Sequence, residues 1–212
     1  MPKNYSIPVQ KILQLGEPTE YMEEWPDYLQ YGFNDTHIQE LIGLLSKDDL
    51  WSDGENKEDW GGVYAWRILG QLKAKEAIEP LYDFLRRNNE ELSYTEIPEA
   101  LNMIGLPALE TSINIIKSPS EHFELKIVAT EIMINIAQTN EEYCTDIIHV
   151  LAEEFKKYKT NNITLNAFLI LGLVKLDCRD YLKEMESAFE EMRVDGLIMG
   201  NWEDVQAEFG QW

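Results

Sequence analysis

Two glutamates of this 212-residue chain, Glu99 and Glu131, occupy the same place in a recurring pattern and are its best candidates for acid–base chemistry. Each stands six residues before a small residue, Gly105 and Ala137 respectively. Two carboxylates can act as general acid and base when both reach one substrate. No histidine lies near either glutamate in the sequence, and glutamates repeated on neighbouring helices are typical of a solvated surface. We therefore assign no catalytic residue.

Positions shortly before the other small residues of the pattern carry aromatic, arginine and amide side chains, which we predict to lie on one face. Aromatic and arginine side chains are frequent anchors of protein interfaces, which makes residues 60–67 the favoured binding site. The predicted partner-binding residues are Trp60, Tyr64, Trp66, Arg67, Glu99, Asn102, Glu131, Asn162 and Asn166. The alternative is structural: Arg67 pairs with Glu99 and the aromatic residues pack against the N-terminal helices.

Sequence motifs of metal or phosphate chemistry do not occur. His37, His122 and His149 have no metal-ligand spacing, and glycine-rich phosphate loops and nucleophile elbows are missing. Cys144 and Cys178 are expected to be buried free thiols of a reducing compartment. We therefore expect no metal and no cofactor, and we favour a non-enzymatic function.

Net charge narrows the class of partner. The chain has 39 acidic and 18 basic residues, a net charge of −21, and the acidic excess is strongest in residues 12–66 and 190–212. Such a surface repels nucleic-acid phosphates and anionic membranes, so it favours a protein partner with a basic surface. The alternative is that the charge only keeps the protein dispersed. The oligomeric state is left open.

Hydropathy favours a protein of the cytoplasm. No apolar run reaches the length of a membrane span, and the N-terminus lacks the basic-then-apolar pattern of a signal peptide. A cytoplasmic location is therefore expected.

Small residues at regular spacing indicate the elements that carry these side chains. The pairs are Ala65/Gly70, Ala100/Gly105, Ile132/Ala137 and Ala167/Gly172, and their second members lie 35, 32 and 35 residues apart. This period is typical of stacked helix pairs, in which small residues allow two backbones to approach closely. The sequence predicts an all-α fold, an α-solenoid of about five antiparallel helix pairs.

The predicted solenoid is a single domain over residues 1–212. It has N-terminal capping helices at 1–34, repeat pairs at 35–192 and a C-terminal capping helix at 193–212. An acidic connector at 17–24 and a polar loop at 48–59 interrupt the helices. Predicted helices span 26–32, 37–47, 60–72, 78–87, 95–105, 106–117, 123–138, 141–158, 162–176 and 181–192, after a first short helix between Pro8 and Gly16. The closing helix begins after Asn201, which caps it, and ends at Gly210.

The run AWRILGQL at Ala65–Leu72, followed by AIEPL at Ala77–Leu81, resembles the short HEAT-like repeat named after phycobilisome lyase subunits. The match is close over 60–86 and 163–190 and looser over 94–117 and 121–157. The whole chain also resembles a bacterial family of HEAT-like proteins. The resemblance implies a superhelix with a concave binding face, and it supplies no catalytic residue.

The favoured function is a non-enzymatic protein-binding scaffold or adaptor that uses this concave face. One alternative is a lyase-type or base-excision enzyme or enzyme subunit. Excision needs a cationic face for DNA, whereas Glu99 and Glu131 are expected on this one. A further alternative is an acidic inhibitor or immunity-type protein that covers a basic site, which the two acidic ends suggest.

Overall fold

The structure is a computed structural model that describes residues 5–18, 25–46 and 56–210. These residues form twelve α-helices and no strand, with 73% of the structure helical, so the all-α prediction is confirmed for them. Most of the predicted connector at 17–24 and of the predicted loop at 48–59 lies outside the described residues. Among the described helices, none combines the length and the apolar character that crossing a membrane requires.

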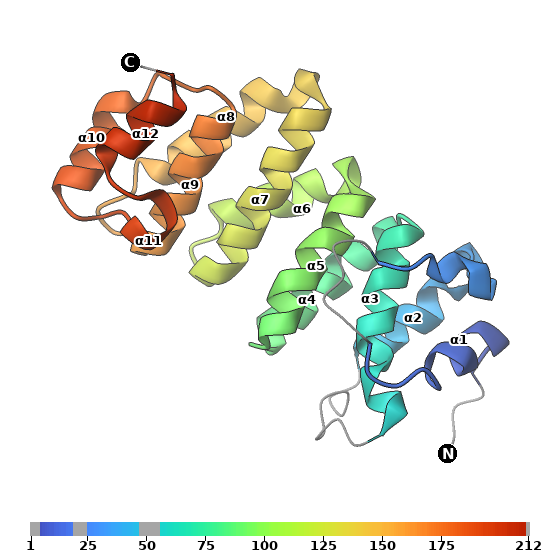
Figure 1. Ribbon diagram of the computed structural model, residues 1–212. Helices are drawn as coiled ribbons and strands as arrows, with labels where there is room; N and C mark the ends of the chain where they lie inside the picture. Colours follow the sequence, from blue (N-terminus) through green and yellow to red (C-terminus); the bar gives the residue numbers. More distant parts are fainter. Residues whose placement is uncertain (1–4, 19–24, 47–55, 211–212) are drawn as a thin grey trace. The chain divides into compact units, whose positions relative to one another are not determined.

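The chain forms two compact units, residues 1–108 and 109–212, and the first is centred on helix α3. Its elements, in which η marks a short 3₁₀ helix, are α1 (Ile7–Ile12), η1 (Tyr28–Tyr31), η2 (Asp35–His37), α2 (Ile38–Leu45), η3 (Lys57–Trp60), α3 (Gly61–Gln71), η4 (Lys75–Ala77), α4 (Ile78–Arg87), α5 (Glu91–Ile104) and η5 (Leu106–Ala108). Helix α3 packs against α2, η1 and α5, and α4 packs against α2 and α5 (Figure 1). All residues of α3 from 61 to 70 are buried, which makes this helix the core of the unit.

The second unit is built around α7 and α9, which lie side by side (Figure 1). Its elements are α6 (Leu109–Lys117), α7 (Phe123–Thr139), η6 (Glu141–Tyr143), α8 (Cys144–Phe155), α9 (Ile163–Lys175), α10 (Leu182–Glu190), α11 (Gly196–Met199) and α12 (Trp202–Glu208). Helix α8 packs against α6, α7 and α9, and the short α11 packs against α9. The boundary between the units separates α5 from α6, which the sequence predicts to be one helix pair.

Helix ends follow local capping chemistry, and two of them differ from the predicted positions. Helix α2 begins at Ile38, one residue after its predicted start, and follows a turn capped by Asn34, whose Oδ1 accepts from the backbone N–H of Thr36. Helix α5 begins at Glu91, four residues before the predicted start, and contains Pro98. The predicted cap at Asn201 is confirmed, because its Oδ1 accepts from the N–H of Asp204.

The small residues of the repeat have two different physical roles. A methyl group on Gly70 would lie 2.8 Å from the Cα of Ala100, so this glycine allows α3 and α5 to touch, as predicted. Gly105 instead ends α5 with a φ of +75°, and a methyl group there would meet nothing closer than a carbonyl oxygen 3.7 Å away. The close-approach prediction is therefore wrong for Gly105, which serves as a helix terminator.

Candidate functional site

The aromatic and arginine residues of the favoured binding site lie in the core of the first unit. Tyr64, Trp66 and Arg67 expose only 4%, 0% and 3% of their surface. They lie on α3, which is covered by its neighbours α2, η1 and α5. In this structure these three side chains therefore offer no surface to a partner. Trp60, at the start of α3, is partly exposed.

Arg67 is the centre of a buried polar cluster. Its Nε donates to Oε2 of Glu96 at 2.8 Å, its Nη2 donates to Oε1 of the same carboxylate, and its Nη1 donates to the hydroxyl of Tyr28 at 3.0 Å. The indole Nε1 of Trp66 donates to Glu96 at 2.8 Å, and the guanidinium carbon lies 5.5 Å from the ring centre of Trp25. Burial alone would lower the pKa of Arg67, but the hydrogen bonds and charge of Glu96 outweigh it and raise that pKa.

The partner of Arg67 is Glu96 and not the predicted Glu99. Both glutamates lie on α5, but Glu96 is on the stripe that faces α3 and is buried, whereas Glu99 is exposed. Glu91, Thr95 and Glu99 are four residues apart and form the solvent stripe of the helix. The sequence indicates that a carboxylate pairs with Arg67 but not which of two neighbouring turns supplies it.

The same cluster attaches the N-terminal segments to α3. The hydroxyl of Tyr64 donates to the carbonyl of Gly16 at 3.0 Å, and its ring meets that of Tyr28 edge-on at 5.6 Å. Burial, with the nearby hydroxyl of Tyr28, raises the pKa of Tyr64 to about 12. The predicted alternative, in which the aromatic residues pack against the N-terminal elements, is confirmed for Tyr64, whereas Trp66 contacts Glu96 on α5 and Phe84 on α4.

Two of the remaining predicted residues, Glu131 and Asn102, are partly buried. Glu131 lies on α7 in the second unit, and burial raises the pKa of its carboxyl group although the charge of Lys175 acts in the opposite direction. Asn102 lies on α5, and its buried Oδ1 has no hydrogen-bond partner among the described residues. Glu99 and Glu131 belong to different units.

The two predicted asparagines on α9 and at its start have structural roles. Asn162 is exposed and caps α9, because its Oδ1 accepts from the N–H of Thr164 at 2.8 Å. Asn166 is fully buried, and its Nδ2 donates to the carbonyls of Tyr158 at 2.9 Å and Arg193 at 2.7 Å. Asn166 therefore does not offer a contact surface in this structure, since the segment around Arg193 covers it.

Four exposed apolar residues of the second unit are not among the predicted binding residues. They are Ile163, Met192, Leu197 and Ile198, which we call the terminal apolar patch, and they expose 40%, 84%, 96% and 43% of their surface. Leu197 and Ile198 lie on α11, which packs beside α9, the helix that begins at Ile163 (Figure 1). The only signal in the sequence is the apolar run GLIM at 196–199, which has too few residues for a periodic pattern.

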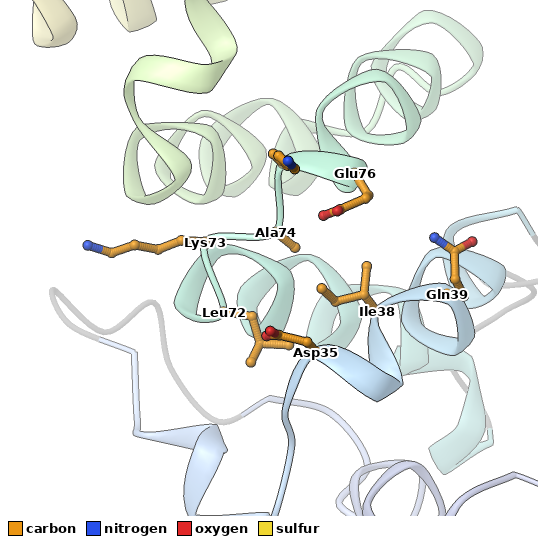
Figure 2. Close-up of a pocket in the computed structure, with 8 residues that line it drawn as sticks. Asp35, Ile38, Gln39, Leu72, Lys73, Ala74 and Glu76 are labelled. Atoms are coloured by element: carbon orange, nitrogen blue, oxygen red, sulfur yellow. The ribbon is translucent and has the colours of Figure 1, made fainter.

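A shallow hollow of about 330 Å³ lies beside the turn between α3 and α4 (Figure 2). It is lined by Asp35, Ile38, Gln39, Leu72, Lys73, Ala74, Lys75 and Glu76. Figure 2 shows the side chain of Lys73 directed away from Ile38 and Leu72. The lining residues include two acidic and two basic ones, so their charges do not select an ionic ligand.

The two cysteines are free, as predicted, and only one is buried. Cys178 is buried, and burial raises the pKa of its thiol, whereas Cys144 at the start of α8 is partly exposed. Within the described residues, no three metal-ligating side chains form a cluster.

No protein-family model matches the chain, and neither the curated proteins nor the solved structures contain a match. The assignment of a function therefore depends on the geometry and charge of the molecule itself.

Proposed function

We propose that the protein is a non-enzymatic binding module, a scaffold or adaptor of HEAT-like helix pairs stacked as a solenoid, whose partner is a protein with a basic surface. The proposal is supported by the way the chain uses its chemically versatile side chains. Those of Tyr64, Trp66, Arg67 and Asn166 lie inside the units and attach one segment to another. The charged residues of the chain are mostly acidic, 39 against 18 basic.

The distribution of charge is the observation that carries the proposal. Residues 1–108 contain 20 acidic and 9 basic residues, and residues 109–212 contain 19 and 9. Among the described carboxylates only Glu96 and Glu154 are buried, and each is paired with a cation, Arg67 and Lys126 respectively. Among the described residues, the first unit has 13 acidic and 7 basic residues and the second has 19 and 9, so the described part of each unit presents an acidic excess to solvent.

Several surface cations of the second unit already pair with carboxylates of the same unit, so they do not neutralise the remaining carboxylates. They pair as Lys156–Glu153, Lys157–Glu154, Lys159–Glu191 and Arg179–Asp177. An acidic surface speeds encounter with a basic protein and disfavours anionic partners. An inhibitor that covers a basic site is one form of this function, whereas DNA excision would require the opposite charge.

The experiment is affinity purification of the tagged full-length protein from its host at about 0.05 M and about 0.5 M salt, followed by mass spectrometry. We expect partners with basic surfaces, captured at the lower salt concentration. The affinity of a repurified partner should fall as salt increases, because exposed charges are then screened. A partner whose affinity does not change with salt would refute the electrostatic part of the proposal.

A further inference from the structure

The terminal apolar patch lies on two segments that the structure holds together. The guanidinium of Arg193 donates to the carbonyl of Asn161 at 2.6 Å, and the N–H of Asp195 donates to the carbonyl of Ile163 at 3.2 Å. The hydroxyl of Thr164 donates to Oδ2 of Asp195 at 2.9 Å. These bonds fix the segment that carries Met192, Leu197 and Ile198 to the start of α9. The patch is therefore preorganised, which reduces the entropy lost on binding.

Met192 is unusual in both its exposure and its backbone conformation. It follows α10 with a φ of +53°, in the left-handed region that favours glycine and asparagine. Lys73 and Asp177, which also have positive φ, follow α3 and α9 and have polar side chains. All three residues end a helix with the same pair of backbone hydrogen bonds, so what distinguishes Met192 is an apolar side chain that is 84% exposed. Methionine is also adaptable at binding surfaces.

Charge around the patch identifies what it can bind. Residues 190–212 contain six carboxylates and one cation, Arg193, and that guanidinium is directed at the carbonyls of Tyr158 and Asn161. Glu190 and Glu191 directly precede Met192 and are exposed, and Glu191 pairs with Lys159 at 2.8 Å, so part of the border charge is neutralised within the protein. An apolar centre with an acidic border complements an amphipathic segment that has lysine or arginine beside its apolar side chains. A second copy is disfavoured because it would bring two strongly acidic surfaces together.

We propose that the terminal apolar patch docks a basic amphipathic helix of a partner protein, with Met192 and Leu197 as its main anchors. This inference rests on the proposed function and specifies its partner. Apolar side chains of the partner helix lie against Met192 and Leu197, and its basic side chains face the carboxylates at the border. Exposed apolar anchors provide affinity, and the complementary charge around them provides selectivity.

The test uses the full-length protein and three synthetic peptides of about 14 residues, roughly four helical turns. The first has leucines on one helical face and lysines elsewhere, the second has the same leucines with glutamates elsewhere, and the third is oligolysine. Affinities are measured by calorimetry for the wild type, for the double variant Met192→Asn/Leu197→Ser, and for the control Ile7→Asn. Ile7 is a 70% exposed apolar residue of the first unit. Asparagine is well tolerated at a positive φ, so the double variant is expected to fold.

We expect the leucine–lysine peptide to bind and the leucine–glutamate peptide not to bind. The double variant should bind the leucine–lysine peptide at least about tenfold more weakly, while Ile7→Asn should bind it like the wild type. Oligolysine has no apolar side chains, so it should bind the wild type and the double variant with the same weak affinity.

Three results would overturn the inference. Equal affinity of wild type and double variant for the leucine–lysine peptide would place docking elsewhere, yet would leave the preference for cationic partners intact. Self-association that the double variant abolishes would make the occupant a second copy. If neither the leucine–lysine peptide nor oligolysine bound the wild type, the proposed function itself would fail together with this inference.

Discussion

Replacing Glu96 with glutamine should destabilise the first unit strongly, because it leaves the guanidinium of Arg67 buried without a counter-charge. Glu96 accepts two hydrogen bonds from Arg67 and one from the indole of Trp66. Removing one partner of a buried ion pair costs about 3–5 kcal/mol. A typical domain is stable by about 5–15 kcal/mol, so Glu96→Gln should remove a large part of the free energy of unfolding.

The double variant Arg67→Met/Glu96→Leu should show a less intuitive result. Apolar residues of similar volume can replace a buried ion pair with little loss or even a gain in stability. The indole of Trp66 and the hydroxyl of Tyr28 would lose partners, at a cost of about 1–3 kcal/mol for each buried group. The two costs together, about 2–6 kcal/mol, overlap the cost of Glu96→Gln, so the double variant should be about as stable as Glu96→Gln although it has lost more hydrogen bonds.

The measurement is urea unfolding monitored by tryptophan fluorescence. Four of the six tryptophans lie in residues 1–108, and Trp66 is fully buried beside Glu96, so its emission reports on this unit. Glu99→Gln is the matched control on the exposed stripe of α5, and it should change stability by no more than about 0.5 kcal/mol. If Glu96→Gln unfolds at the same urea concentration as Glu99→Gln, the charge-pair reasoning is refuted.

Three further perturbations test the packing, the strained anchor and the half-buried carboxylate. Gly70→Ala should destabilise the first unit by about 1–3 kcal/mol, because the new methyl group meets the backbone of Ala100. Gly43→Ala on α2 places its methyl group where no atom lies within 4 Å, so it should stabilise the unit by about 0.5–1 kcal/mol. Thermal unfolding of both variants would contradict this reasoning if their melting temperatures shifted in the same direction. Met192→Asn should raise stability by about 0.5–1 kcal/mol in urea unfolding, because asparagine suits a positive φ, and a loss of stability would contradict the presence of strain at this residue. Burial raises the pKa of Glu131 above its ordinary value of 4.5, so the folded state favours the protonated form and loses stability as pH rises above 4.5. Glu131→Gln should therefore be more stable than the wild type at pH 7, by an amount that shrinks as the pH is lowered toward 4.5. A stability difference that does not vary with pH would count against burial as the cause.

Helices are the part of the structure that the sequence predicts best. Helices α3, α4, α7 and α9 lie within one or two residues of their predicted bounds, because each combines a periodic apolar face with clear start and stop signals. The start of α5 is missed because Glu91 and Leu92 give no capping signal and Pro98 suggests a start nearer to itself. Regular spacing of small residues also suggests one role for all of them, yet Gly70 permits a helix contact and Gly105 ends a helix.

The predicted binding residues were chosen by their chemical type, and burial removes four of them, Tyr64, Trp66, Arg67 and Asn166, from the surface. Aromatic and arginine side chains are common at interfaces and in buried clusters alike, and a single sequence does not distinguish the two uses for Trp66 or Arg67. The proposed anchors Met192 and Leu197 have the opposite property, since isolated apolar residues in a short tail segment give no periodic signal. Their exposure depends on how the tail folds back on α9, which is a tertiary property.

Buried polar groups attach both ends of the chain to the helices that they cover. In the first unit Arg67 holds Tyr28, and in the second Asn166 and Arg193 hold the segment before α11 to the loop before α9. An apolar contact would tolerate a shift of a capping segment by a turn, but a buried guanidinium or amide loses its hydrogen bonds if its partner moves. The polar contacts therefore fix the position of each terminal segment, and in the second unit they fix the position of Met192 and Leu197 as well. A surface intended to dock a helix needs that rigidity, because anchors that must be ordered on binding contribute less to affinity.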